Sequence, residues 1–551
     1  MQYKNSLKQV VLPFLFALVL SGGFLLGKMW VPSSEVISGN RMFIYPQTNK
    51  IDALLNLIEE EYVDTINKSD LVEGIIPEIL KNLDPHTVYI PEEDLQAANQ
   101  ELDGNFGGIG VQFSMQDDTV LVISVIPGGP SEKVGIIPGD RIITVNDSLI
   151  AGVSIGTDKV VGMLRGEMGT KVDVGVLRRD KSDLMEVEIT RGSIPVNSVD
   201  VSYMVTDSIG YIKISRFGRN TYKEFLTAIA RLKAHNCQSV IIDLRGNSGG
   251  YLDIAISMTN EFLSKGDLIV YTEGKASPRQ DVFANGQGSC QDMGVTVLID
   301  EFSASASEIF AGAIQDNDRG LIVGRRSFGK GLVQQQIPLP DGSAIRLTIA
   351  RYYTPSGRGI QKPYKDGVED YHRDILARFE HGEFFEKDSI EFDKSLRFTT
   401  RNGRVVFGGG GVMPDVFVAR DTSAFSDFYY SLRDKGIIYQ YALKYSDDYR
   451  LQLQRYDDVD NLQDFLDNQS LLKGLLVFAK EKGIEFDQKD FSRSKDYIAI
   501  ELKAYIARNI LDNEGFYPIF QQIDEVFKKA ISEVKVGNDI LVFSDDEGVE
   551  F

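Results

Sequence analysis

The sequence predicts a multidomain protein of mixed α/β and α+β class, in which an α/β core is the largest part. Its 551 residues are more than one hydrophobic core usually serves, so two or more domains are expected. Continuous apolar strands alternate with helical segments from 193 to 420, which is typical of a sheet covered on both faces. A glycine-rich, strand-forming stretch occupies 101–192, and helical apolar periodicity dominates 421–551.

Composition excludes several classes of function. The formal net charge of −21 argues against a nucleic-acid-binding protein, which needs basic surface. Two cysteines, Cys237 and Cys290, are too few for a disulfide scaffold, although one bridge or two free thiols both remain open. The four histidines show no metal-ligand spacing, so neither a metal nor a cofactor is expected.

The N-terminus predicts a membrane segment. Lys4 and Lys8 precede an apolar run of 18 residues from Val10 to Gly27, which is near the minimum length for a spanning helix. We interpret 1–30 as an uncleaved signal anchor, with the bulk of the chain outside because basic residues precede the span. This predicts a single-pass protein of the bacterial inner membrane facing the periplasm. Export after signal cleavage is the alternative, although no A-x-A-like site follows.

A linker, 31–47, and an N-terminal helical region, 48–100, follow the predicted anchor. Apolar residues recur at helical spacing from Ile51 to Tyr62 and again from Leu71 to Leu83. The second stretch ends in Leu-Asp-Pro-His-Thr-Val-Tyr. Its histidine, His86, invites assignment as a catalytic base, but a position just after Asp-Pro favours a structural turn residue.

Residues 101–192 combine a glycine-rich loop, an apolar strand and a Pro-Gly-Asp turn. This order resembles a PDZ domain, in which loop N–H groups bind a terminal carboxylate and an edge strand accepts the peptide. A glycine-rich β domain without a ligand is the alternative. The resemblance implies peptide-binding positions at Gly108, Ile109, Gly110, Val111 and Phe113.

Two short motifs in the predicted core carry chemistry. Ser305 lies in Phe-Ser-Ala-Ser-Ala-Ser-Glu-Ile, between an apolar strand and a helical segment, where backbone N–H groups can serve an oxyanion. Lys330 lies in a Gly-Lys-Gly turn followed by Gln334. A lysine takes a serine proton only if desolvation lowers its pKa far below the free value near 10.4. A closely packed helix start and a surface turn are the structural alternatives.

Together these motifs resemble the carboxyl-terminal processing proteases, which are tail-specific serine proteases with a Ser/Lys dyad. The family's S-A-S-A-S-E and G-K-G-x-x-Q runs imply Ser305 as nucleophile, Lys330 as base and Gln334 as the residue that orients the base. The resemblance also implies a core related to the Clp-protease/crotonase fold, with the PDZ domain inserted before it. It covers most of the chain to about residue 420 and fades in the helical C-terminal domain of unknown role, 421–551.

The run Arg245 to Gly250 resembles the family's R-x-N-x-G-G turn. It implies an oxyanion N–H from Gly249 or Gly250, with a second from Ala306. The same run contains Ser248 in a G-x-S-x-G pattern, which raises a trypsin-like PDZ protease as a rival. Histidine order, domain order and the α/β pattern argue against that rival.

The sequence therefore predicts a serine endopeptidase that recognises apolar C-terminal tails through the PDZ domain and cleaves with the Ser/Lys dyad. Expected partners are protein substrates with unstructured apolar C-termini and, through the predicted anchor, the membrane; an adaptor protein or a homo-oligomer stays open. A catalytically idle PDZ scaffold and acyl-CoA chemistry on the related crotonase fold are the rivals from other classes.

Overall fold

The computed structural model describes residues 50–179, 181, 183–365 and 367–534. The chain divides into two compact units, Met1–Glu78 and Ile79–Phe551. In the first unit lie α2 (Lys50–Glu61) and most of α3 (Lys68–Leu80), at the two helical stripes of the sequence.

The predicted inner-membrane localisation is wrong. Among the helices that the structure describes, none combines the length and the apolar character needed to cross a bilayer. The apolar run from Val10 to Gly27, on which that prediction rested, lies outside the described residues. That prediction rested on the hydropathy of this run and on the two lysines that precede it.

A six-stranded sheet forms the centre of the core, in the order β10-β11-β12-β15-β16-β21. Its inner strands run parallel, and only the edge strand β10 is antiparallel to its neighbour. The strands are β10 (Val199–Met204), β11 (Ile209–Ile214), β12 (Ser239–Asp243), β15 (Gly294–Ile299), β16 (Leu321–Gly324) and β21 (Val416–Phe417).

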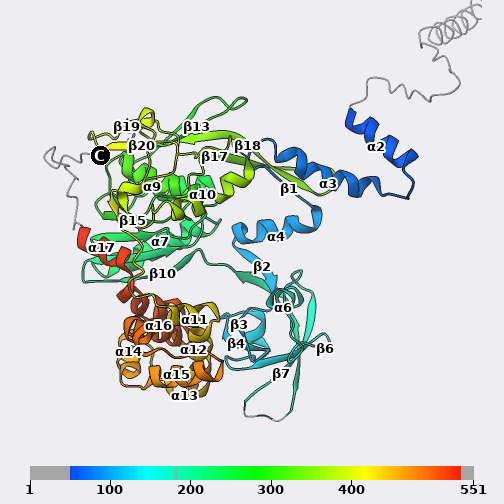
Figure 1. The fold of residues 1–551 in the computed structure, drawn as a ribbon, viewed down its shortest axis with the longest axis vertical. Coiled ribbons are helices and arrows are strands. Elements are labelled where there is room, and N and C mark those ends of the chain that lie inside the picture. The colour runs from blue at the N-terminus through cyan, green and yellow to red at the C-terminus, as the bar shows by residue number, and fades with distance from the viewer. Residues whose placement is uncertain (1–49, 180, 182, 366, 535–551) are drawn as a thin grey trace, which may run out of the picture. The chain divides into compact units, whose positions relative to one another are not determined.

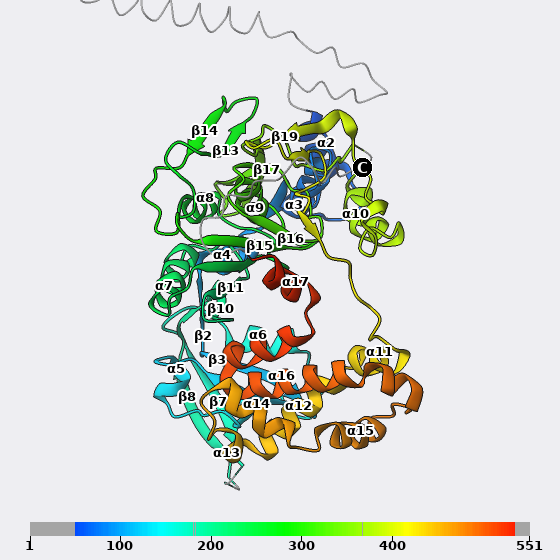
Figure 2. The same cartoon turned by 90° about the vertical axis from the view of Figure 1, so that its left-hand side faces the viewer.

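Helices cover both faces of this sheet, as the apolar strands predict. Ile242 on β12 packs in one buried cluster with α7 (Thr221–Ala234), α8 (Leu252–Asn260) and α9 (Ala306–Asp316). Its neighbour Ile241 packs in a second cluster with α17 (Glu525–Glu533), because successive strand residues point to opposite faces. Figure 2 shows α17 beside β15 and β16. The last described helix therefore completes the core of the protein.

A second sheet holds β17 against β18, with β1 on the other side of β18. In this sheet Gln334 pairs with Thr348, and β1 follows directly after the His86 turn. The strands are β1 (Val88–Ile90), β13 (Leu268–Glu273), β14 (Gln280–Phe283), β17 (Leu332–Pro338) and β18 (Ala344–Tyr353).

The glycine-rich stretch folds as a small β domain whose first and last segments pair with each other. After α4 (Glu92–Asp103), β2 (Asn105–Gly108) pairs with β9 (Gly192–Pro195), so the chain enters and leaves this domain at one place. Its sheet has the order β3-β4-β5-β7-β8, with β6 beside β5. The elements are β3 (Val111–Gln116), β4 (Thr119–Val125), α5 (Pro130–Lys133), β5 (Arg141–Val145), β6 (Ser148–Leu149), α6 (Thr157–Leu164), β7 (Lys171–Leu177) and β8 (Met185–Thr190).

The region after residue 425 is helical with a hydrophobic core of its own, and Figure 1 shows its helices gathered together. Its helices are α11 (Asp427–Asp434), α12 (Ile437–Asp448), α13 (Arg450–Leu453), α14 (Val459–Asp467), α15 (Leu471–Glu481) and α16 (Gln488–Phe520). In chain order, α10 (Val368–Glu380) and the hairpin β19 (Arg397–Thr399) with β20 (Val405–Phe407) come between β18 and β21 of the core. Cys237 and Cys290 are buried and free.

Candidate active site

Ser305 occupies a strained turn between strand and helix. It is the N-cap residue of α9, with φ 55° and ψ −113°. A positive φ is costly for a residue with a Cβ, and such strain persists where the surrounding structure imposes it. The Ser305 carbonyl accepts from the N–H groups of Glu308 (2.9 Å) and Ile309 (3.0 Å), which begin the helix. The helix start thus holds the backbone of this serine.

A buried carboxyl, that of Glu308, joins the serine segment to the lysine segment. One oxygen accepts from the N–H of Ser305 (2.8 Å) and of Lys330 (2.9 Å). The other accepts from the N–H of Gly329 (2.7 Å) and from the Ser327 hydroxyl. Burial raises the pKa of Glu308 to about 7, against these hydrogen bonds, which favour its charged form. The sequence analysis missed this role, although the Ser-x-x-Glu spacing of a capping box could have indicated it.

Lys330 is positioned as a weakly basic amine. Its Nζ donates to Gln334 Oε1 at 2.9 Å, and Gln334 Nε2 donates to the His86 carbonyl, which fixes the orientation of the amide. Burial, together with the charge of Arg346, lowers the pKa of Lys330 and outweighs the opposing effect of Glu308. Within the described part of the chain, no hydrogen bond joins Lys330 Nζ to Ser305 Oγ. Catalytic hydrogen bonds of this kind often tighten only when substrate binds.

The His86 turn supports the lysine through its backbone. The Asp84 carboxylate accepts from the N–H of His86 (2.8 Å), the N–H of Thr87 (2.9 Å) and the Thr87 hydroxyl (2.6 Å). The imidazole Nε2 lies 2.8 Å from the Tyr371 hydroxyl. Burial, then the charge of Lys330, lowers the pKa of His86 to about 4, so the ring is neutral near pH 7. Its carbonyl, rather than its ring, meets the Gln334 side chain.

A cleft of about 550 Å³ brings the predicted catalytic and oxyanion residues together. Ser305, Lys330 and Gln334 line it from the core. Its remaining walls include Gly249, Gly250, Ala306, Tyr251, Leu252, Ile309, Leu332, Val333, Arg346 and Tyr352. The apolar side chains among them contribute to the desolvation that a lysine base requires.

The glycine turn lies directly against the serine. A Cβ on Gly249 would approach the Ser305 Cβ to 2.8 Å, and φ is +105° at Gly249 and +145° at Gly250, so both positions need glycine. The Gly249 N–H donates to Asn247 Oδ1 at 2.8 Å. Of the described residues, none accepts a hydrogen bond from the N–H of Gly250 or of Ala306. These two N–H groups are therefore free to donate to an oxyanion.

Ser248 also lines the cleft, but the contacts of a trypsin-like nucleophile are missing. No hydrogen bond of the described residues links its side chain to a histidine: His86 lies against Tyr371, and His235 Nδ1 lies 2.9 Å from the Arg231 carbonyl. His372 and His381 lie at α10 and its C-terminal end.

The predicted carboxylate loop leads into a strand at the edge of the β domain. Gly110 has φ +78° and its carbonyl accepts from Ile126 N–H at 2.9 Å. The Ile109 carbonyl accepts from the N–H (3.0 Å) and hydroxyl (2.7 Å) of Ser131. Gly108 ends β2; Val111 and Phe113 lie on β3, which pairs only with β4 in the described sheet. Free backbone groups on an edge strand can pair with an added peptide.

Known protein families match separate parts of this chain. Family models match for peptidase family S41 at residues 208–371, a PDZ domain at 107–189, and the activating protease CtpB N-terminal domain at 31–94. A family of unknown function matches residues 428–512. The carboxy-terminal-processing protease of Bartonella bacilliformis is 35% identical over 347 residues, which cover 62% of this chain and 79% of that protein.

The chain belongs to the carboxy-terminal processing proteases of peptidase family S41. The CtpB protease of Bacillus subtilis is 34% identical over 58% of this chain and 66% of that protein. The solved photosystem II D1 C-terminal processing protease aligns over 67% of this chain and 92% of its own, at 24% identity and a TM-score of 0.34. The predicted family, the serine-protease activity and the multidomain α/β fold with an inserted PDZ domain are confirmed.

Proposed function

We propose that this protein is an endopeptidase that captures apolar C-terminal tails of protein substrates on its PDZ domain and cleaves them with Ser305 and Lys330. The observation that carries the proposal is the Glu308 carboxyl, which accepts the backbone N–H of both residues at 2.8 and 2.9 Å. It links a candidate nucleophile to a candidate base across 25 residues of sequence within one cleft. Structural packing alone gives no reason for a half-buried lysine at that place.

The geometry supports an acyl-transfer mechanism. Neutral Lys330 takes the proton of Ser305 as Oγ attacks the peptide carbonyl carbon. The N–H groups of Gly250 and Ala306 donate to the oxyanion, and Ala306 adds the positive end of the α9 dipole. As the intermediate collapses, the Lys330 ammonium protonates the leaving amine, and an acyl-enzyme remains. Lys330 then takes a proton from water, which hydrolyses the ester.

The β domain supports the choice of substrate. A peptide added beside β3 would direct its terminal carboxylate to the N–H groups of the Gly108–Gly110 loop. Val111 and Phe113 pack against the buried cluster of this domain, which includes Val160 and Leu164 of α6. An apolar last residue therefore suits this site better than a charged one, because a charge would be desolvated without a partner.

The test is digestion of an unfolded protein with an apolar C-terminus, beside a copy that ends in charged residues. The full chain is compared with Ser305→Ala, Lys330→Ala and, as matched serine control, Ser248→Ala. We expect cleavage to be lost in the first two variants, retained in the third, and weak on the charged tail. Loss in Ser248→Ala alone would assign the nucleophile to Ser248. Absence of cleavage of both substrates by the unaltered chain would instead favour the idle-scaffold alternative or a requirement for an activating partner.

A further inference from the structure

The loop that supplies the oxyanion N–H begins at an arginine held between two carboxylates. Arg245 Nη2 donates to Asp243 Oδ2 at 2.6 Å, and its Nε lies 3.1 Å from both Asp243 oxygens. On the other side, Nη1 and Nη2 donate to the two oxygens of Asp524 at 2.9 and 2.7 Å. Two-pronged pairs of this kind constrain direction as well as distance. Asp243 is local to the loop, whereas Asp524 comes from the C-terminal region.

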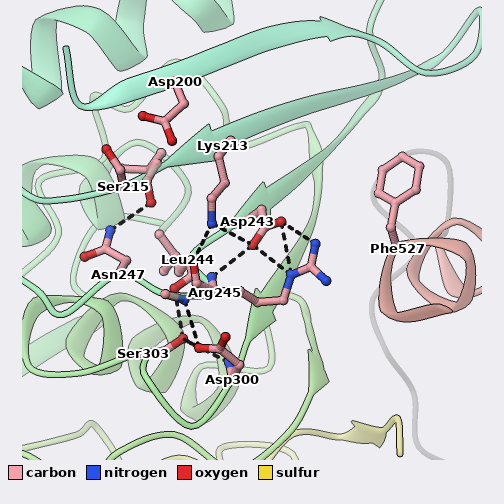
Figure 3. A network of polar contacts seen from close by, with 12 residues as sticks. Asp200, Lys213, Ser215, Asp243, Leu244, Arg245, Asn247, Asp300, Ser303 and Phe527 are labelled. Carbon is pink, nitrogen blue, oxygen red and sulfur yellow. Dashed lines mark hydrogen bonds and ion pairs between the residues drawn. The ribbon is translucent and has the colours of Figure 1, made fainter. Parts of the chain in front are cut away.

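The same loop is also held along its backbone. The Arg245 carbonyl accepts from Lys213, which Figure 3 shows beside Asp243 and Arg245. The Gly246 N–H donates to Asp300 at 2.9 Å. The Asn247 side chain donates to the Ile214 carbonyl at 3.0 Å and accepts from Gly249. A shift at Arg245 would therefore be passed toward Gly250 along a short segment that these hydrogen bonds hold in place.

Asp524 has little freedom of its own. It is the N-cap residue of α17, and its Oδ1 accepts from the Phe527 N–H at 3.0 Å. Val526, Phe527 and Ala530 of this helix are buried against the central sheet. The side chains of Arg245 and Asp524 are 19% and 11% exposed, so solvent screens their attraction less than that of a surface pair. The carboxylate is thus fixed to the sheet that also carries the loop.

We propose that Asp524 is a positioning residue for catalysis: it holds Arg245, and through Arg245 the glycine turn whose N–H groups face the oxyanion. This inference rests on the proposed Ser305 mechanism and assigns a catalytic contribution to α17. Helix α17 lies outside residues 208–371, which match the peptidase family, and outside residues 428–512, which match the family of unknown function. The group that holds Arg245 is thus the side chain of Asp524 in the same chain, and no ligand is involved.

Asp524→Asn separates this role from helix capping, because asparagine caps a helix as well as aspartate does. The amide loses the charge and turns an NH2 group toward the guanidinium. Complete loss of an oxyanion donor lowers kcat by about 10² to 10³. We expect a displaced donor to lower kcat by roughly tenfold, with KM unchanged, because ground-state binding does not use the oxyanion.

The experiment measures the rate at which a fluorophosphonate labels the full chain, together with kcat and KM on a tail peptide. In labelling, Ser305 Oγ forms a bond to phosphorus and fluoride leaves, so the rate depends on the base and on oxyanion stabilisation. Glu525→Gln is the matched control: its exposed carboxylate pairs with Lys528 at 2.8 Å on the same helix. We expect slow labelling in Asp524→Asn, and an unchanged rate in Glu525→Gln.

Arg245→Gln and the double variant test the route. If Asp524 acts through Arg245, the double variant labels no more slowly than Arg245→Gln alone. Additive losses would overturn the proposal, as would an unchanged rate in Asp524→Asn, or a loss that disappears once activity is corrected for a lowered Tm. Undiminished labelling of Ser305→Ala would instead overturn the proposed function, and this inference with it.

Discussion

Gln334→Glu replaces an amide nitrogen by an oxygen in the side chain that contacts Lys330, the proposed base. The natural amide presents its oxygen to Lys330 Nζ at 2.9 Å and its NH2 group to the His86 carbonyl. A carboxylate of the same shape keeps the first contact but places a second oxygen against that carbonyl. It also adds a negative charge beside an amine that must be neutral to act as a base. We therefore expect the substitution to raise the pKa of Lys330 and to suppress activity near neutral pH.

The size of the effect follows from the separation of the two groups. Two unit charges 4 Å apart attract by about 4 kcal/mol at an effective dielectric constant near 20. Each 1.4 kcal/mol is a factor of about ten in the protonation equilibrium, so the neutral fraction of Lys330 would fall by up to roughly a thousandfold. Desolvation of the new carboxylate offsets part of this gain. The expected loss in kcat/KM at pH 7 is therefore about 10²- to 10³-fold.

The assay is the pH profile of kcat/KM on a peptide with an apolar C-terminus. Activity is lost as pH falls through the pKa of the free enzyme's base, so this acid limb should move to higher pH in Gln334→Glu and activity should recover in alkali. Gln335→Glu adds the same charge at the next, exposed position of β17 and should leave the limb in place. An unmoved limb in Gln334→Glu would refute Lys330 as the base; equal shifts in both variants would show a general charge effect.

Three substitutions of buried polar residues in the core should lower the stability of the fold. Tyr352→Phe removes a buried hydroxyl that donates to the Ser305 carbonyl at 3.0 Å and also to the Lys330 carbonyl, and should cost about 1–3 kcal/mol in urea unfolding. Asp316→Ala strands fully buried Arg358, its partner at 2.8 Å, and should cost about 3–5 kcal/mol by the same measurement. Although burial opposes it, the charges of Arg245 and Lys213 hold the pKa of Asp243 well below its usual range. Its contribution is thus present above about pH 4 and lost below, so Asp243→Asn should lower Tm more at pH 7 than at pH 3.

Much of the core could be predicted from local pattern. Strands such as Ser239–Asp243 are apolar throughout because helices cover both faces, and that pattern is visible in the sequence alone. Ser305 and Lys330 stand in motifs of distinctive spacing, so their presence in one cleft was foreseeable. The apolar strand pattern and the motif spacing are both local, so each can be recognised without knowing which segments pack nearby.

Other features depend on contacts between distant segments. The sequence left Gly249 and Gly250 as equal oxyanion donors, and only the bond from Gly249 to the Asn247 side chain distinguishes them. The role of Glu308 arises because the fold places the segment 327–330 against the start of α9, where Ser327 and Lys330 donate hydrogen bonds to the Glu308 carboxyl. Similarly, an apolar stripe on Val526, Phe527 and Ala530 predicts an amphipathic helix but does not name the sheet it covers.

Glu308 and Lys330 impose opposite requirements on the same cleft. A charged Glu308 best satisfies the four donors around it, yet its charge raises the pKa of Lys330 and so disfavours the neutral amine that the proposed mechanism needs. Burial of the lysine, assisted by Arg346, is the larger effect, and the net pKa shift of Lys330 is downward. The pKa of Lys330, and with it the proposed role as base, therefore depends on how completely the cleft excludes water. A substrate chain that fills the cleft removes further water, strengthens that desolvation and lowers the pKa again, so binding itself is expected to make the lysine a better base.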